Sequence, residues 1–293
     1  MLDTLDLEIL MHRDVHFGGS FDVMASYYEE DGVGVMPDFE THRIYELKLI
    51  EEETGSNLAE SMLPEPAKAQ VERAKGVYLD LRSVYEEDKG EIPRMISDLI
   101  LSEEEYPKGE IHEIVKHGST MVMPLIDLLL ADRFYDPLYP GYGRAPILAA
   151  QCLEKIQDEK AIPPLFQALG QDNFFTDESI IHALISFGDK AKSFLLKRLL
   201  QKPASKDNER AAVALSSFPY DPEIGTAFIS VLTDEELADK KTLALYAACG
   251  CSEIIDEEQR KEFLNLASLS HLNNEIKNEI ELILLIWKKH KVS

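Results

Sequence analysis

Apolar residues along this chain recur every three to four positions, which is the spacing that lines up one face of an α-helix. In the second half, the helical pattern itself repeats. Four apolar segments align without gaps, each preceded by another helical stretch: Met121–Leu129, Ala161–Leu169, Ala191–Leu199 and Ile224–Leu232. Their starts lie 30 to 40 residues apart. Repeats of this length with two helices each predict an all-α fold in which helix pairs stack into a superhelix.

The N-terminal third also has helical periodicity, but it lacks the repeat. Ser20 is a suitable N-cap for a helix that begins at Phe21. The stretch 67–87 carries apolar residues in alternating steps of three and four, which predicts a helix with a narrow buried seam. We therefore expect an acidic N-terminal helical region over residues 1–107. A repeat superhelix over residues 108–293 would follow, closed by a C-terminal capping helix.

The charge of the chain narrows the choice of partners. It has 54 Asp or Glu against 30 Lys or Arg, a formal net charge of −24. Such a chain repels phosphate groups, so we expect neither nucleic acid nor an anionic membrane as a partner. No apolar run approaches the about 18 residues of a membrane helix, and the acidic first ten residues do not resemble a signal peptide. Three cysteines are too few for a disulfide framework, and we expect a cytoplasmic protein of unspecified oligomeric state.

The string from Ile156 to Leu169 carries a more specific signal. It resembles the consensus of HEAT repeats of the phycobilisome-lyase type, a class of HEAT- and armadillo-like superhelices. In that family an Asp-x-x-Ala turn leads into a second helix that opens with proline and ends with leucine. The matching residues here are Asp158, Ala161, Pro163, Pro164, Leu165 and Leu169. The resemblance covers roughly residues 108–270.

This resemblance implies a fold more than an activity, because the family includes bilin lyases and chaperones, a di-iron hydroxylase, a DNA glycosylase and many scaffolds. The hydroxylases use several His-Glu pairs, whereas this sequence has the single pair His112-Glu113. A glycosylase needs a basic face with aromatic residues. The one basic stretch here, Lys190–Arg210, is equally suited to an acidic partner, a phosphate or the acidic first third of the same chain.

A second candidate site is the segment Met11–Phe21. His12 and His16 are four residues apart, with Asp14 between them, and on a helix both imidazoles would share one face as a metal pair requires. These three residues, with His112 as a further ligand, form our candidate metal site. The alternative is a chain terminus that these polar side chains pin to the body of the protein.

The connections between repeats form the third candidate site. In a superhelix, equivalent connections stack along one edge. Aromatic, Arg and amide or carboxylate groups of the kind found in interface hot spots would then become neighbours. The predicted partner-binding residues are Tyr135, Asp136, Tyr139, Tyr142, Arg144, Phe174, Phe175, Lys197, Arg198, Asn208 and Arg210. The alternative is that the aromatic residues cover helix ends while the polar ones cap helices.

We therefore expect a non-enzymatic scaffold or adaptor, without a cofactor, that binds a protein or peptide through its concave face and its inter-repeat loops. The alternative is a metal- or tetrapyrrole-dependent enzyme or chaperone. A third hypothesis is that the acidic first third closes the groove by docking on Lys197, Arg198 and Lys202.

Overall fold

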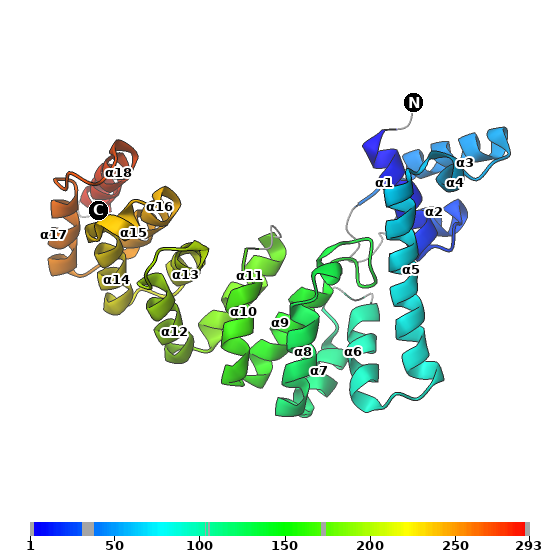
Figure 1. Ribbon diagram of the computed structural model, residues 1–293, viewed down its shortest axis with the longest axis horizontal. Helices are drawn as coiled ribbons and strands as arrows, with labels where there is room; N and C mark the ends of the chain where they lie inside the picture. Colours follow the sequence, from blue (N-terminus) through cyan, green and yellow to red (C-terminus); the bar gives the residue numbers. More distant parts are fainter. Residues whose placement is uncertain (1–2, 31–37, 103, 105, 171–173, 291–293) are drawn as a thin grey trace. The chain divides into compact units, whose positions relative to one another are not determined.

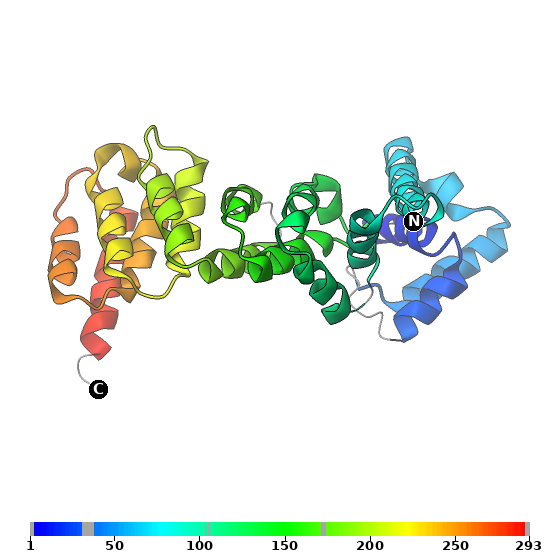
Figure 2. The ribbon, with the colours of Figure 1, turned by 90° about the horizontal axis from the view of Figure 1, so that it is seen from below.

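The computed structural model describes residues 3–30, 38–102, 104, 106–170 and 174–290, without the side chains of residues 174, 175, 289 and 290. Within these residues the fold is all-α, with 18 α-helices, four short 3-10 helices and no strand (Figures 1 and 2). The predicted fold class is therefore confirmed. The chain divides into two compact units, residues 1–158 and 159–293. The boundary at residues 107 and 108 expected from the sequence stays a prediction.

The first unit combines the N-terminal helices with the beginning of the repeats. Its α-helices are α1 (Thr4–His16), α2 (Phe21–Glu29), α3 (Thr41–Thr54), α4 (Leu58–Met62), α5 (Glu65–Glu86), α6 (Glu91–Leu101), α7 (Lys108–Lys116), α8 (Val122–Leu129) and α9 (Ala145–Ile156). Two 3-10 helices, η1 (Gly118–Met121) and η2 (Asp132–Tyr135), lie between the later helices. The side chain of Ser20 accepts a hydrogen bond from the Val23 N–H, so this residue is the N-cap of α2 as predicted.

The long helix α5 organises the N-terminal helices. It packs against α1 on one side and against α6, which follows it after a sharp turn (Figure 1). Val71, Ala74 and Leu81 of the predicted seam are buried, whereas Tyr85 at its end is 39% exposed. Because α6 also packs on α7, α8 and α9, the first repeat helices share a core with the N-terminal region.

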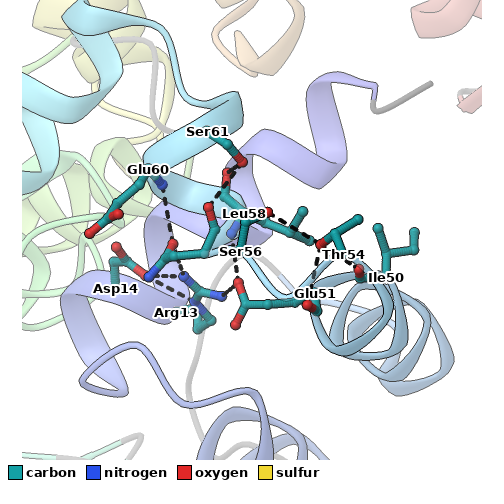
Figure 3. A network of polar contacts seen from close by, with 10 residues as sticks. Arg13, Asp14, Ile50, Glu51, Thr54, Ser56, Leu58, Glu60 and Ser61 are labelled. Atoms are coloured by element: carbon teal, nitrogen blue, oxygen red, sulfur yellow. Dashed lines mark hydrogen bonds and ion pairs between the residues drawn. The ribbon is translucent and has the colours of Figure 1, made fainter.

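A buried cation joins α1 to α3 and α4. The guanidinium of Arg13 is fully buried and donates hydrogen bonds to Asp14 and Glu51, as Figure 3 shows. It also donates to the side-chain oxygen of Asn57 at 3.2 Å. It also lies over the ring of Phe21, 4.4 Å from the centroid. A buried charge is tolerated only where it is paired and hydrogen-bonded in this way.

The second unit continues the helix pairs. It comprises η3 (Glu159–Ala161), α10 (Ile162–Ala168), α11 (Phe174–Ser186), α12 (Asp189–Leu199), α13 (Lys206–Ser216), α14 (Pro222–Thr233), α15 (Glu235–Ala238), α16 (Lys241–Gly250), η4 (Cys251–Glu253), α17 (Glu257–Leu266) and α18 (Asn274–His290). Each of the four segments aligned in the sequence coincides, to within two residues at either end, with the second helix of a pair, namely α8, α10, α12 or α14.

Successive pairs in the second unit stack like on like. The first helix α13 packs on the next first helix α16, while the second helix α14 packs on the next second helix α17. The last helix, α18, lies against α16 and α17 (Figure 2). It buries Ile276, Ile280, Ile283 and Trp287, and the indole Nε1 donates a hydrogen bond to the carbonyl of Ser252. No described helix is both long and apolar enough to span a membrane.

Candidate functional site

The connection between α8 and α9, residues 130–144, is much longer than a helix pair needs, and we call it the long connection. Its first part is η2, and its second part is a tight turn. Three successive residues of this turn, Gly141, Tyr142 and Gly143, have positive φ angles of 87°, 53° and 75°. Such angles suit glycine and are uncommon for tyrosine. The backbone of Tyr142 is therefore held in an unfavourable conformation by the turn around it.

The aromatic side chains of the long connection pack into the first unit. Tyr139 is buried with 9% exposure, and the Tyr135 hydroxyl donates a hydrogen bond to the carbonyl of Leu129 at 2.8 Å. The ring of Tyr142 lies against that of His16, with 4.2 Å between centroids and 32° between planes. Tyr135, Tyr139 and Tyr142 of the predicted partner-binding set thus stabilise the long connection through contacts inside the first unit.

The polar residues of the long connection make specific contacts as well. One carboxylate oxygen of Asp136 accepts from the backbone N–H of Leu138 at 2.9 Å, and the other accepts from the side chain of Gln70 on α5 at 2.8 Å. Arg144 donates to the carbonyl of Glu104. The long connection is thereby fastened to α5 and to the end of the α6 region.

His16 joins α1 to α5 and to the long connection. Its Nε2 lies 3.2 Å from the carbonyl oxygen of Pro137, and its Nδ1 lies 2.8 Å from the hydroxyl of Tyr78 on α5. Since a carbonyl only accepts, Nε2 carries the proton and Nδ1 accepts from the tyrosine. Burial, reinforced by neighbouring His12, lowers the pKa of His16 to about 3. The imidazole is therefore neutral at pH 7.

His12 lies one turn earlier on the same face of α1, as the spacing predicts. Its ring centroid is 5.1 Å from that of His16, and it meets Phe39 edge-on at 5.2 Å. The side chain is 5% exposed, and burial lowers its pKa to about 4. Within the described part of the chain its Nδ1 has no hydrogen-bond partner. An unpaired buried polar atom of this kind is costly and marks a site that warrants explanation.

The third member of the predicted metal site points elsewhere. Asp14 accepts two hydrogen bonds from Arg13, at 2.9 and 2.7 Å, and so belongs to the buried cation network. His112 is exposed on α7. Among the described residues, no group of three or more His, Cys, Asp or Glu side chains is placed to hold a metal ion.

A cleft of about 420 Å³ opens between α1, α5 and the long connection. It lies within the about 300–1,000 Å³ that ligand pockets commonly have. Its lining comes from all three elements: Glu8, Met11 and His12 on α1, Gln70 on α5, and Asp136, Pro137 and Leu138 in the long connection. We call it the α1 cleft. Of the residues singled out in the sequence, it combines His12 with Asp136, more than 120 positions later.

The remaining predicted residues lie in the second unit. Among them, the side chain of Asn208 bonds to the backbone at the junction of α12 and α13. It is fully buried, and its amide nitrogen donates to the carbonyls of Arg198, Leu199 and Gln201. Its oxygen accepts from the backbone N–H of Ser205 at 2.7 Å. This one side chain closes the end of α12 and caps the start of α13.

The cations of the basic stretch are partly neutralised within their own unit. Lys192 forms ion pairs with Asp189, Asp221 and Glu223. Lys202 pairs with Asp234 and Glu236, so its docking on the acidic first third would require exchange of these partners.

Three cations of the predicted partner-binding set also lie within this stretch. Arg210 pairs with Asp207 at 3.2 Å, and Arg198 donates to Gln201. Lys197 is exposed and makes no ion pair in the part of the chain that the structure describes. Phe174 and Phe175 begin α11, but their side chains lie outside the described residues.

Five lining residues of the α1 cleft were not among the predicted site residues: Glu8, Met11, Gln70, Pro137 and Leu138. Glu8 is one turn before His12, so the periodicity of α1 was sufficient to place the two on one face. No local signal connects Gln70 with the long connection, because that contact depends on the packing of α5.

The shape of the long connection can be tested at Gly141. An added Cβ would lie 2.9 Å from the carbonyl oxygen of Ile100, at a φ of +87°. We expect Gly141→Ala to lower the free energy of unfolding by about 1–3 kcal/mol, through strain and displacement of the turn. Gly76→Ala, in the middle of α5 with nothing within 4 Å, is the control and should instead be neutral or stabilising by up to about 1 kcal/mol. Urea unfolding of both variants measures this, and equal stabilities would contradict the close packing at Gly141.

Comparison with known protein families locates the repeats. Residues 143–216 match the family model of HEAT repeats. The matched segment runs from α9 to α13 and includes the string Ile156–Leu169, which resembles the HEAT-repeat consensus. No curated protein matches the chain. The phycobilisome-lyase subtype therefore stays a prediction, and the identification that the match supports is that of a protein with HEAT repeats over residues 143–216.

Proposed function

We propose that this protein is a non-enzymatic HEAT-repeat scaffold or adaptor. It binds a protein or peptide partner through the concave face of its repeats and through the connections between them. HEAT repeats generally offer extended, preformed surfaces for protein partners. The observation that carries the proposal is the long connection, which is fastened by His16, Gln70 and Arg144 and borders a cleft. Surfaces ordered in advance bind with a smaller entropic cost.

The alternative of a metal- or tetrapyrrole-dependent enzyme or chaperone receives less support. His16 uses both ring nitrogens in hydrogen bonds to Tyr78 and Pro137, and Asp14 is engaged by Arg13. All of these bonds would have to be given up before the side chains could meet at one ion. His12 alone keeps a nitrogen without a partner among the described residues.

The proposal is tested by capture of a partner from lysate of the source organism, followed by measurement of its affinity. Hot-spot aromatics commonly contribute about 2 kcal/mol or more to binding. We expect the double variant Phe174→Ala/Phe175→Ala to weaken the purified complex about 30-fold, as that energy implies. Titration calorimetry with the captured partner gives the ratio directly.

The matched control is Ile255→Ala/Leu264→Ala, which removes two apolar side chains that are 67% and 51% exposed elsewhere in the second unit. We expect this variant to bind as wild type does. Equal losses in both double variants would place the binding face elsewhere. If the wild-type protein captures no partner, the scaffold proposal fails.

A further inference from the structure

The α1 cleft has an unbalanced charge. Its lining contains the two carboxylates of Glu8 and Asp136 and no Lys or Arg. Glu8 makes no ion pair within the described part of the chain. Asp136 is held in position by Gln70 and the Leu138 N–H, two neutral donors that use one lone pair on each oxygen. Both carboxylates can therefore still accept a hydrogen bond from a cation.

His12 adds an acceptor at the same place. It lines the cleft, it is 5% exposed, and its Nδ1 has no partner among the described residues. Because burial lowers its pKa to about 4, the ring is neutral and offers a lone pair rather than a positive charge. Two carboxylates and a neutral imidazole form a site for a donor that brings both N–H groups and a positive charge.

The geometry distinguishes an extended cation from a metal ion. Glu8, His12 and Asp136 line one cleft of about 420 Å³, yet they are not close enough together to form a three-ligand metal group in the described residues. The cleft is also partly apolar, through Met11, Pro137 and Leu138. A Lys or Arg side chain has the matching parts, since its aliphatic stem packs on apolar surface while its head binds carboxylates.

We propose that the α1 cleft binds a basic side chain, Arg or Lys, presented by the protein or peptide partner. The inference rests on the proposed function, because a partner must supply that side chain. The charge-assisted hydrogen bonds to Glu8 and Asp136 orient the basic group, and the neutral imidazole of His12 accepts a further N–H. The partner is thus one whose binding segment carries an Arg or Lys.

The test uses the full chain with N-acetyl-L-arginine amide and N-acetyl-L-lysine amide as probes. Long-range ¹H–¹⁵N spectra report on the ring nitrogens of His12, whose signals are assigned by loss in His12→Gln. We expect a saturable shift of the His12 Nδ1 signal at millimolar probe, and the relative affinities of the two probes identify the preferred head group. N-acetyl-L-citrulline amide, which has the shape of arginine without its charge, should cause no such shift. An equal response to citrulline, or no saturable response to either cation, overturns the proposal.

Two carboxylate variants locate the binding. Glu8→Gln should weaken probe binding about threefold to fivefold, as expected for a part-exposed ion pair. Glu53→Gln removes the same charge from an exposed position of α3 and should leave binding unchanged. Because Glu8 is exposed, its change is not expected to disturb folding, and an unaltered His16 signal verifies this. Equal affinities of the two variants, or a saturable response to Zn²⁺ in place of the amides, would contradict the cation site.

The outcome can be separated from that of the proposed function. If a partner binds the wild type and the double variant Glu8→Gln/Asp136→Asn equally, the scaffold function is supported and the proposed role of the α1 cleft is contradicted. If the arginine or lysine probe binds but no partner is captured, the cation site in the cleft is supported and the scaffold proposal is contradicted.

Discussion

Replacement of Arg13 by methionine is expected to lower the free energy of unfolding by about 3–5 kcal/mol. The guanidinium has no exposed surface, and it binds Asp14 at 2.7 Å and Glu51 at 2.8 Å. Methionine fills part of the volume but leaves both carboxylates without their cation. Glu51 also accepts a hydrogen bond from the backbone N–H of Leu58 at 2.7 Å, which keeps its carboxylate beside the position of the lost guanidinium (Figure 3).

The effect should be near the lower end of that range, because the side chains of Asp14 and Glu51 keep 17% and 26% of their exposure and can regain water. Arg82→Met is the matched control. It removes an exposed ion pair with Glu86 on α5, which is expected to change stability by no more than about 0.5 kcal/mol.

Urea unfolding gives the stability of both arginine variants, and hydrogen exchange of the α1–α4 amides localises the loss. If Arg13→Met and Arg82→Met are equally stable, Arg13 does not hold the N-terminal helices together.

Acidification from about pH 7.5 to about pH 5 is expected to destabilise the first unit by about 2 kcal/mol for each of His12 and His16. Both pKa values are lowered from 6.5, to about 4 and about 3, first of all by burial. Between those values and 6.5 the unfolded chain binds protons that the folded chain rejects. The stability is therefore complete above about pH 6.5 and is lost as the pH falls toward the folded-state values.

The comparison is between pH profiles rather than absolute stabilities, because any substitution at these buried positions also changes packing. His12→Gln and His16→Gln should each flatten the decline by about 2 kcal/mol. His112→Gln, which removes an exposed histidine of α7, should keep the wild-type profile. Thermal unfolding at a series of pH values measures all four proteins, and parallel profiles would show that neither buried histidine titrates in this way.

The local pattern of apolar residues was sufficient to predict the helices and their arrangement in pairs. The periodicity of apolar positions depends only on residues three and four apart, so it placed α5 within two residues of its bounds and identified the helix pairs of the repeats. The N-cap at Ser20 was likewise readable, because a cap bonds to a backbone N–H three residues on. The i, i+4 spacing also put His12 and His16 on one face.

The candidate site was only partly predictable. Asp136 and Tyr142 were predicted to bind a partner because the long connection exceeds what a helix pair needs, but the sequence left open whether its aromatic rings face a partner or the protein. In the structure, Tyr142 lies on His16 and Tyr139 is buried. The role of the predicted partner-binding residues, Phe174 and Phe175 included, stays a prediction.

The sequence by itself determined the all-α class, the paired helices and the acidic balance, because each of these follows from neighbouring residues or from composition. Only the tertiary structure decided that His16 meets Pro137 across 121 positions, that Arg13 meets Asn57 across 44, and that Glu8 and Asp136 line one cleft. The physical reason is that such contacts depend on how whole helices pack. Many packings satisfy the same local periodicity, and the best burial and hydrogen bonding of all the side chains together selects among them.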